Sequence, residues 1–443
     1  MANSYLSRTP SSTTNRRTYT FSVWAKFCTG STSSTLLNVG PYNSSKEFRL
    51  TRNASGTLEF YDYNGSSYEF RYRTRRFLRD VSAWYHIVCA VDTTNGTSGD
   101  RVKIYVNGSQ ETEFDVSTAP SVNLDTNFNV NNIFYVGSAA NGNYTDGYLS
   151  HVALVDGQQL APTVFGETDS SSGIWKFKSP SGVTWGTNGF HLKFENSGNL
   201  GLDSSGNSNT FTVGGNGRQA LDTPSNVYAT MNALNSWGDN TLSKANLTLT
   251  TSSNTWGHTS STMHMNSGKW YFEANLDAHA SGYSAPTFIF SGEDSTFSKN
   301  QVGFVADGDG SYGIGSNGRK YTNGLESGSV VFSELSTGDK VNIAFDADAG
   351  KIWFGVNGTY LDSGNPSTGA NPYFTATTLQ NNDVQFTSLA YNSGNTVSFN
   401  FGNGYFGTTA ISSAGSNGNG SLFEYDVPSG YYALNTKNIN TYG

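Results

Sequence analysis

The chain has 443 residues, 50 of them Gly and 10 Pro, and its aromatic and charged residues each make up 14%. This aromatic content excludes a disordered chain, and the composition is too poor in Leu, Ala, Glu and Lys for a mainly helical protein. The net charge of −8 disfavours a nucleic-acid partner, because such proteins usually lean basic.

Residues 1–17 contain no apolar run, so we expect no signal peptide and synthesis in a host cytoplasm. No segment reaches the length of a membrane span, and we expect no membrane partner. The two cysteines, Cys28 and Cys89, lie in apolar strand patterns, which favours buried free thiols over a disulfide bridge.

Residues 19–27, YTFSVWAKF, alternate apolar and polar side chains as a half-buried strand does. Short strand patterns follow. Residues 84–108 end in KIYVNG, and a similar motif, KIWFGVNG, occurs again at residues 351–358. Both copies predict a hairpin closed by Asn-Gly, where a tight turn needs positive φ at both positions. Two such hairpins, far apart in the chain, predict an all-β protein of two tandem antiparallel β-sandwiches.

Residues 1–165 resemble the laminin-G-like, concanavalin-type jelly roll in the opening SYLSRTPSSTTNRRTYTFSVWAKF, the strand WYHIVCAVD and the ending FYVGSAANGNYTDGYLSHVALVD. The opening is similar to proteins encoded by marine bacteriophages. The resemblance implies a recognition domain in a virion. Laminin-G-like domains can hold calcium at a loop rim, for which Asp62 and Asp146 are the candidates here, and we expect no other cofactor.

Residues 166–225 are rich in Ser, Gly and Asn, yet they contain aromatic residues such as Trp175, Phe177 and Trp185 that need burial. We therefore predict an ordered connector rather than a free linker. Charge supports a boundary near residue 165, because residues 1–165 hold 14 Lys/Arg and 13 Asp/Glu, whereas residues 166–443 hold 12 and 21.

Residues 226–406 resemble the SPRY family in SGKWYFEANL at 267–276, GDKVNIAFDADAGKIWFGVNGTYL at 338–361 and NTVSFNFGNGYF at 395–406. The resemblance implies a second β-sandwich. Residues 407–443 form a C-terminal tail rich in aromatic residues, and we expect this tail to dock onto another subunit.

Jelly rolls of this class include polysaccharide hydrolases, which commonly carry Glu-x-Asp-x-x-Glu on one strand, a motif that this sequence lacks. The nearest pattern places Glu111, Glu113 and Asp115 on one predicted strand face, and we interpret them as solvated side chains. His258 and His264 have a spacing near that of metal ligands but lie near a turn. A Ser–His–Asp arrangement stays open, but no G-x-S-x-G motif precedes a helix, and we expect no catalytic residue.

Arginines alternate with aromatic residues in YEFRYRTRRFLRD, so Arg71, Arg73 and Arg75 share one face of a predicted strand. They indicate either a patch for an anionic glycan or acidic partner, or a solvated face balanced by Glu69 and Asp80. Tyrosines at or near turns are further candidates for stacking on sugars or anchoring protein contacts. These are Tyr61, Tyr63, Tyr68, Tyr144, Tyr312, Tyr321 and Tyr360.

Together these patterns favour a non-enzymatic phage virion protein, carried on a tail fibre, a spike or the head surface. Its expected partners are capsid or tail subunits, further copies of itself and a host-surface glycan. Two alternatives stay open: a virion-associated polysaccharide depolymerase and a bacterial surface adhesin. These functions are inferred largely from resemblance of fold, and one fold can serve several functions. Choosing between them therefore requires the residues of the functional site.

Overall fold

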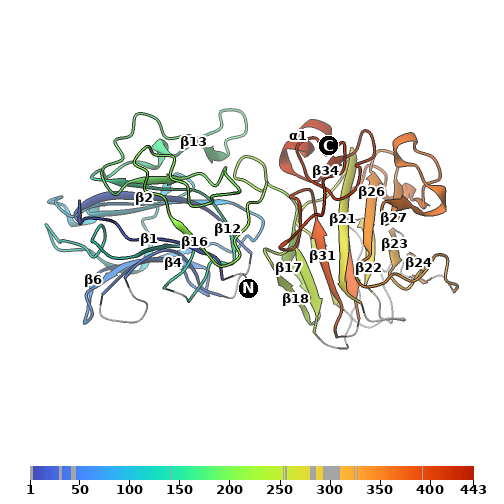
Figure 1. Ribbon diagram of the computed structural model, residues 1–443, viewed down its shortest axis with the longest axis horizontal. Helices are drawn as coiled ribbons and strands as arrows, with labels where there is room; N and C mark the ends of the chain where they lie inside the picture. The colour runs from blue at the N-terminus through green and yellow to red at the C-terminus, as the bar shows by residue number, and fades with distance from the viewer. Residues whose placement is uncertain are drawn as a thin grey trace. The chain divides into compact units, whose positions relative to one another are not determined.

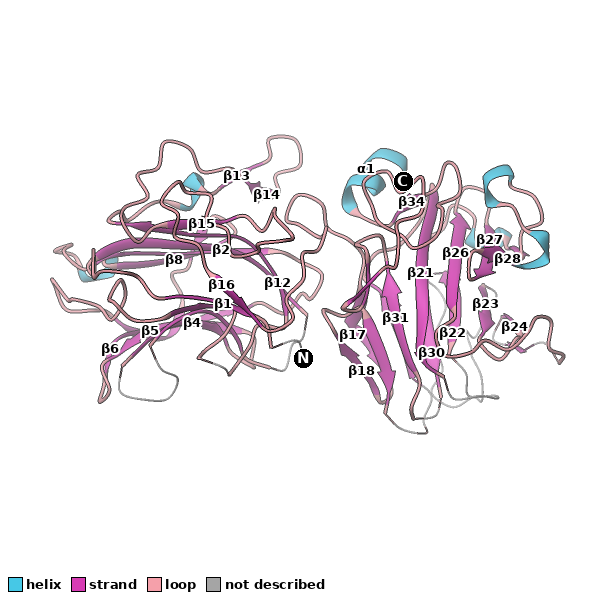
Figure 2. Cartoon of the chain, viewed as in Figure 1, coloured by secondary structure: helices cyan, strands magenta, loops and turns pink. Residues whose placement is uncertain are grey.

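The computed structural model describes residues 3–28, 32–40, 46–140, 142–252, 254, 257–279, 286–292, 310–323, 325–326, 328–391 and 393–443. The chain forms two compact units, Met1–Gln219 and Ala220–Gly443. Figure 1 follows the chain through both, and Figure 2 shows that strands and loops dominate each of them. In the described part of the chain, no helix combines the length and apolarity that crossing a membrane requires.

The first unit is a β-sandwich whose larger layer is an eight-stranded antiparallel sheet. Phe48, Phe60 and Phe70 of three neighbouring strands point into the core, where their rings meet edge-on or tilted. In spatial order its strands are β10 (Phe114–Thr118), β6 (Tyr68–Phe77), β5 (Thr57–Tyr63), β4 (Glu47–Arg52), β3 (Ser34–Val39), β11 (Phe134–Val136), β1 (Tyr5–Arg8) and β16 (Thr212–Gly214).

The second layer of this sandwich is a six-stranded antiparallel sheet. Its inner side chains include Phe21, Ile87 and Ile104, all buried in the same core as the phenylalanines of the eight-stranded sheet. In spatial order its strands are β15 (Phe190–Leu192), β12 (Gly147–Asp156), β2 (Thr18–Phe27), β7 (Tyr85–Asp92), β8 (Val102–Val106) and β9 (Ser109–Gln110), and a short helical turn, η1 (Ser98–Asp100), precedes β8.

The predicted connector divides between the two units. Residues 166–219 belong to the first unit, where β15 and β16 complete the two sheets. Between them and the jelly-roll strands lie η2 (Pro162–Val164) and a separate hairpin of β13 (Gly166–Thr168) and β14 (Trp175–Phe177). In Figure 2 this hairpin lies over the six-stranded sheet, on the side away from the eight-stranded one.

The second unit is also a β-sandwich, and its core gathers Phe272, Phe290, Phe386 and Phe401 between the two sheets. The seven-stranded sheet has the order β17 (Met231–Trp237), β20 (Gly257–Ser261), β30 (Val384–Ala390), β22 (Thr287–Gly292), β23 (Ser311–Gly315), β24 (Lys320–Thr322) and β25 (Leu325–Glu326). The nine-stranded sheet has the order β18 (Asn240–Ser243), β19 (Thr248–Thr251), β31 (Thr396–Asn400), β21 (Lys269–Ala278), β26 (Lys340–Asp346), β27 (Lys351–Val356) and β28 (Thr359–Tyr360), with β29 (Phe374–Thr375) beside β27 and β34 (Tyr432–Ala433) beside β21.

The C-terminal tail packs on its own unit. Phe423 and Tyr431 are buried against Tyr271 and Trp353 on the outer face of the nine-stranded sheet. Their burial removes the reason for assigning these two rings to another subunit. Besides β34, the described elements of this region and of the loops before it are β32 (Tyr405–Phe406), β33 (Thr409–Ala410), α1 (Thr436–Tyr442), η3 (Leu361–Ser363), η4 (Pro366–Thr368) and η5 (Thr377–Leu379).

The predicted fold class is confirmed: the chain is all-β, with two tandem sandwiches that are antiparallel except for the short β21–β34 pair. Both predicted hairpins form, as β7–β8 and β26–β27. Asn107 and Gly108 have φ of 48° and 79°, and Asn357 and Gly358 have φ of 49° and 84°. This is the pair of positive φ values that the Asn-Gly turns require.

Candidate functional site

The outer face of the eight-stranded sheet carries a continuous row of polar and aromatic side chains, one from each of seven strands. Because side chains alternate along a strand, these residues point away from the core that Phe48, Phe60 and Phe70 fill from the other face. The strand register aligns Ser7, Tyr135, Asn38, Arg49, Tyr61, Arg71 and Thr118 as successive neighbours.

Glu47 organises the middle of this row. Its carboxylate accepts hydrogen bonds from Asn38 Nδ2 at 2.9 Å and from the Tyr61 hydroxyl at 2.8 Å, and it forms an ion pair with Arg49. All four side chains are buried or nearly so. The carboxylate therefore fixes the orientation of the Tyr61 ring and of the Asn38 amide.

A second carboxylate, Glu59, pairs with two arginines beside it and offsets one of their two positive charges. Glu59 accepts from Arg71 Nε at 2.6 Å and from Arg73 Nη2 at 3.2 Å, while Asn53 Nδ2 lies 3.2 Å from its other oxygen. Arg75 is paired with Glu113 at 3.5 Å and with Asp115 at 3.3 Å.

The structure thus places Arg71 and Arg73 on one face, as the alternation predicts, but both are paired with the same carboxylate, Glu59. The balancing groups differ from those expected from the sequence, because Glu69 bonds Asn64 and Asp80 caps Ser82. Glu59 engages both guanidinium groups, so an anionic ligand would have to compete with this carboxylate for them.

Tyrosines gather at two places on the same face. Tyr68 is 40% exposed and its ring centroid lies 5.4 Å from that of Tyr61 and 5.3 Å from that of Tyr63, with the Arg71 guanidinium 4.3 Å from its own ring centroid. At the other end, Tyr5 lies between Tyr135 and Tyr144, with centroid distances of 5.8 and 6.2 Å. Four of the predicted tyrosines, Tyr61, Tyr63, Tyr68 and Tyr144, therefore belong to this one face.

The tyrosines predicted in the second unit do not form a site. Tyr321 is buried and its hydroxyl accepts from Asn317 Nδ2 at 3.1 Å. Tyr360 packs against the buried cluster beneath the tail, and Tyr312 packs edge-on against Phe374. Their positions near turns reflect packing at the rim of the core.

The two calcium candidates have different roles. Both oxygens of Asp62 are taken by Asn127, whose backbone N–H and Nδ2 lie 2.7 and 2.6 Å away. Burial raises the pKa of Asp62 to about 6, and burial also raises the pKa of Asp146. Among the described residues, no three His, Cys, Asp or Glu side chains gather where they would hold a metal ion.

The acidic cluster singled out in the sequence is not a strand face. β10 begins only at Phe114, so the prediction that Glu111, Glu113 and Asp115 share one face of a strand is wrong. A bulge in the pairing with β6 follows Phe114, which breaks the alternation assumed for this segment. Glu111 is buried and bonds Arg76 Nε at 2.6 Å.

Two of the histidines considered as metal ligands or catalytic bases, His258 and His86, pack against tryptophan rings. His258 stacks on Trp237 with a centroid distance of 6.1 Å, and His264 is exposed outside the strands. Ser22 Oγ and His86 Nε2 lie 2.9 Å apart, but both residues are fully buried, and Trp175 occupies the position of a triad carboxylate. A substrate has no access to this pair.

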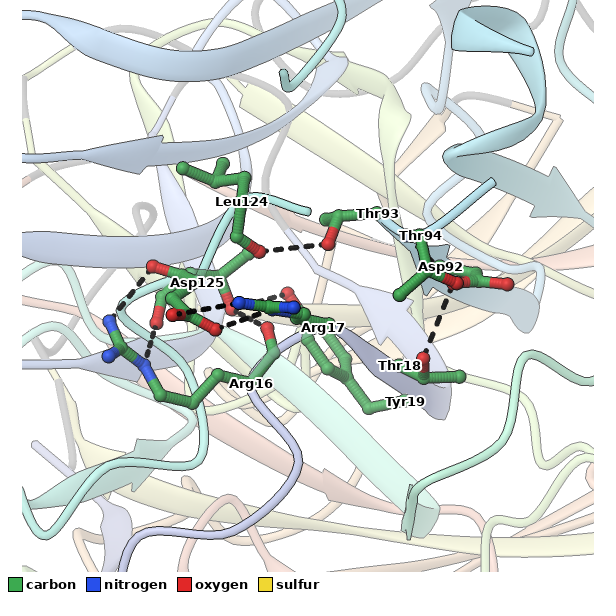
Figure 3. Close-up of polar contacts among 10 residues, drawn as sticks. Arg16, Arg17, Thr18, Tyr19, Asp92, Thr93, Thr94, Leu124 and Asp125 are labelled. Carbon is green, nitrogen blue, oxygen red and sulfur yellow. Dashed lines mark hydrogen bonds and ion pairs between the residues drawn. The ribbon is translucent and has the colours of Figure 1, made fainter. Parts of the chain in front are cut away.

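The predicted free thiols are confirmed, since Cys28 and Cys89 are both buried and unbridged. The Arg-Arg pair of the opening motif is structural as well (Figure 3). Arg17 forms a two-pronged ion pair with Asp125 at 2.7 and 3.3 Å, and Arg16 donates to the Asp125 and Thr126 carbonyl oxygens at 2.8 and 2.7 Å. These contacts hold the loop before β11 against β2.

Comparison with known proteins agrees with this architecture. Residues 2–164 match the family model described as the concanavalin A-like lectin/glucanases superfamily. No curated protein matches the chain. The first sandwich is therefore similar to this superfamily over its full jelly roll.

Solved structures with a similar fold include three of different kinds. The SPRY domain of human HERC1 is 16% identical, and the match covers 38% of this chain and 96% of that one with a TM-score of 0.30. Domains LG4–5 of the mouse laminin alpha1 chain are 11% identical, covering 97% and 94%, with a TM-score of 0.30. The CBM40 of the Ruminococcus gnavus IT-sialidase, bound to α2,3-sialyllactose, is 18% identical, covering 30% and 73%, with a TM-score of 0.24.

Proposed function

We propose that the chain is a non-catalytic, glycan-binding component of a phage virion, and that the outer face of the eight-stranded sheet binds the glycan. The observation that carries the proposal is the pair of tyrosine clusters, around Tyr68 and around Tyr5, at the two partly exposed ends of the row from Ser7 to Thr118. Tyrosine rings stack on the apolar faces of sugars, and amide, guanidinium and carboxylate groups pair with sugar hydroxyls.

Charge compensation specifies the glycan further. Glu47 pairs with Arg49, and Glu59 pairs with both Arg71 and Arg73. A sulfated or uronate-rich chain would have to compete with these carboxylates for the guanidinium groups. A neutral glycan needs no free charge and can stack on the partly exposed rings of the two tyrosine clusters, so we propose a neutral polysaccharide as the ligand.

A hydrolytic role is disfavoured by the spacing of the two carboxylates. Glu59 lies opposite Thr51, four residues along β4 from Glu47, which separates the two positions by about 13 Å. Glycosidases place their carboxyl groups roughly 5 to 9.5 Å apart. The proposal therefore includes no catalytic residue, and it includes no bound calcium or other cofactor.

The virion location and the partners are part of the same proposal. The opening residues, similar to phage proteins, and the pairing of two recognition sandwiches support a place on a tail fibre, a spike or the head surface, beside capsid or tail subunits. The sheets end in short edge strands such as β9 and β16, whose unpaired backbone groups suit contact with another copy of the chain.

The test uses the full-length chain on an array of neutral, sulfated and uronate-containing glycans. We expect binding to neutral glycans, reduced at least tenfold by Tyr68→Ala. Tyr442→Ala is the matched control, because its ring is 44% exposed in the other unit. Unchanged binding by Tyr68→Ala would contradict the site. Release of new reducing ends, lost in Glu47→Gln or Glu59→Gln, would establish a depolymerase instead.

Location is tested separately. Mass spectrometry of purified particles should detect the chain in fixed copy number, with particles lacking it as the control. Detection on a bacterial envelope in cells without phage would identify an adhesin instead.

A further inference from the structure

Residues 165–187, here called the cover segment, lie on the outer face of the six-stranded sheet. Phe165, Val183 and Trp185 of this segment pack against Val88 and Val155 of the sheet in a cluster separate from the main core. The segment also holds the hairpin β13–β14. Three histidines from three different strands of the sheet meet aromatic residues of this segment, and together they use half of the six histidines in the chain.

His86 of β7 is the most enclosed of the three. It is fully buried; its ring stacks on Trp24 with a centroid distance of 4.7 Å, and the Trp175 ring centroid lies 6.0 Å away. Trp175 donates its indole N–H to His86 Nδ1 at 3.0 Å, so Nδ1 holds a lone pair and Nε2 carries the proton that faces Ser22 Oγ. A second proton on this ring would remove the acceptor that Trp175 uses.

The indole of Trp175 packs directly against the backbone of two glycines, Gly108 and Gly166. A Cβ atom added at Gly108 would come within 2.6 Å of the indole, and one added at Gly166 within 2.5 Å. The ring is thus in close contact with the Asn-Gly turn of the β7–β8 hairpin on one side and with β13 on the other. Through this side chain the cover segment contacts both His86 and the turn of the β7–β8 hairpin.

His151 of β12 and His191 of β15 form the second part of the cluster. His151 stacks on Phe177 at a centroid distance of 3.5 Å and 10° between planes, and His191 stacks on Trp185 at 5.6 Å and 23°. The two imidazoles lie 5.6 Å apart. His151 Nδ1 and His191 Nε2 are buried without a hydrogen-bond partner, so neither nitrogen has an acceptor ready for an added proton.

The surrounding charges do not favour imidazolium ions. Lys193 lies near His151 and His191, and its ammonium is 3.7 Å from Glu195. The charge of Asp203 favours a proton on His191, but this carboxylate already accepts the backbone N–H groups of His191, Ser205 and Asn209.

The remaining charged and titratable groups around the cover segment are engaged elsewhere. Lys176 of β14 is paired with Asp169 and Glu167, and Asp156 accepts from Asn188 and Asn129. Tyr105 of β8 packs on the apolar cluster. Burial lowers the pKa of His86 and of His151 to about 3 and that of His191 to about 4.

We propose that these three histidines are an acid-released clasp, whose protonation detaches the cover segment from the sheet while the sandwich beneath stays folded. A solvated imidazole binds its proton near pH 6.5, so below that pH each histidine favours the detached form by up to about tenfold per pH unit. Three together give up to roughly a thousandfold per pH unit. The sandwich is spared because the inner side chains of β7, Ile87, Cys89 and Val91, carry no histidine.

Hydrogen exchange of the full-length chain between pH 7.5 and 4, corrected for intrinsic rates, tests the clasp. Peptides covering residues 165–187 should lose protection at a pH at which peptides of β2 and β7 keep theirs. The logarithm of the opening constant should rise with falling pH with a slope above one, because opening takes up more than one proton.

Two variants test each part of the cluster independently. His86→Gln keeps an oxygen that can accept from Trp175, and His151→Phe keeps a ring that can stack on Phe177, yet neither side chain titrates. Each should lower the slope by about one proton. His258→Gln, which removes a histidine stacked on Trp237 in the other unit, is the control and should leave the slope unchanged. Loss of protection in β2 and the cover segment together, or an unchanged slope in both variants, would overturn the proposal.

Discussion

The indole N–H of Trp175 lies 3.0 Å from His86 Nδ1, and the same indole fills the space above Gly108 in the first Val-Asn-Gly turn. The second sandwich repeats this arrangement, because a Cβ at Gly358 would come within 2.6 Å of the Tyr425 ring. In each unit, a segment that follows the repeated hairpin covers the outer face of its sheet and places an aromatic ring on the turn glycine. The repeated sequence phrase therefore specifies a packing position as well as a turn.

The first prediction concerns these two glycines. Gly108→Ala and Gly358→Ala should each destabilise their unit by about 2–4 kcal/mol, from the positive φ and from displacement of the covering ring. Gly96→Ala is the control, since a Cβ there meets nothing within 4 Å. Urea denaturation followed by circular dichroism measures the effect, and equal stability of all three variants would show that the rings are not held by the turns.

The fold could be predicted from the sequence because its main signals are local. Alternation in residues 19–27 and the Asn-Gly turns at Asn107 and Asn357 determine strands and hairpins without knowledge of distant contacts. The segment 111–115 could not be predicted in this way, because the pairing of β10 with β6 and its bulge depend on a distant strand.

The site could be predicted only in part, for a related reason. The face of Arg71 and Arg73 follows from alternation along one strand, but their pairing with Glu59 depends on the register between β5 and β6. The grouping of His86 with Trp175 joins residues 89 positions apart, and no local pattern indicates it. The only indication in the sequence is that Trp175 needs burial, which does not identify His86 as its partner.

The second prediction concerns the buried carboxylate that holds the C-terminal tail. Glu273 accepts the backbone N–H groups of Glu424 and Tyr425, both at 2.9 Å, and the Tyr271 hydroxyl at 2.9 Å. Glu273→Ala leaves these donors unpaired and should cost about 3–5 kcal/mol. Limited proteolysis of this variant should then cleave within residues 407–434. Asp383→Asn, which changes an exposed carboxylate, is the control and should leave the tail resistant. A resistant tail in Glu273→Ala would show that apolar packing alone holds it.

The third prediction concerns pH and Asp62. Its pKa is raised from 3.8 to about 6 by burial, so between these values the folded state binds a proton that the unfolded state does not. Its contribution to stability therefore falls as pH rises, by about 3 kcal/mol between pH 3.8 and 7. The free energy of unfolding of the wild type minus that of Asp62→Asn should therefore fall as the pH rises through this range. For Asp125→Asn the same difference should rise with pH, because the hydrogen bond from Arg17 lowers the pKa of Asp125.

The last prediction is a gain of binding. Among the described residues, Glu59 is the carboxylate that pairs with Arg71 and Arg73, and its side chain is largely buried. Glu59→Gln keeps the size of this side chain but leaves both guanidinium groups without a counter-charge, so the outer face becomes more positive by one charge. Retention on a sulfated-polysaccharide column should increase and should decline again with added salt, because the new attraction is electrostatic. Asp80→Asn makes the same change in net charge away from the row and should be retained like the wild type. Equal retention of both variants would mean that net charge, and not the face of the eight-stranded sheet, governs anion binding.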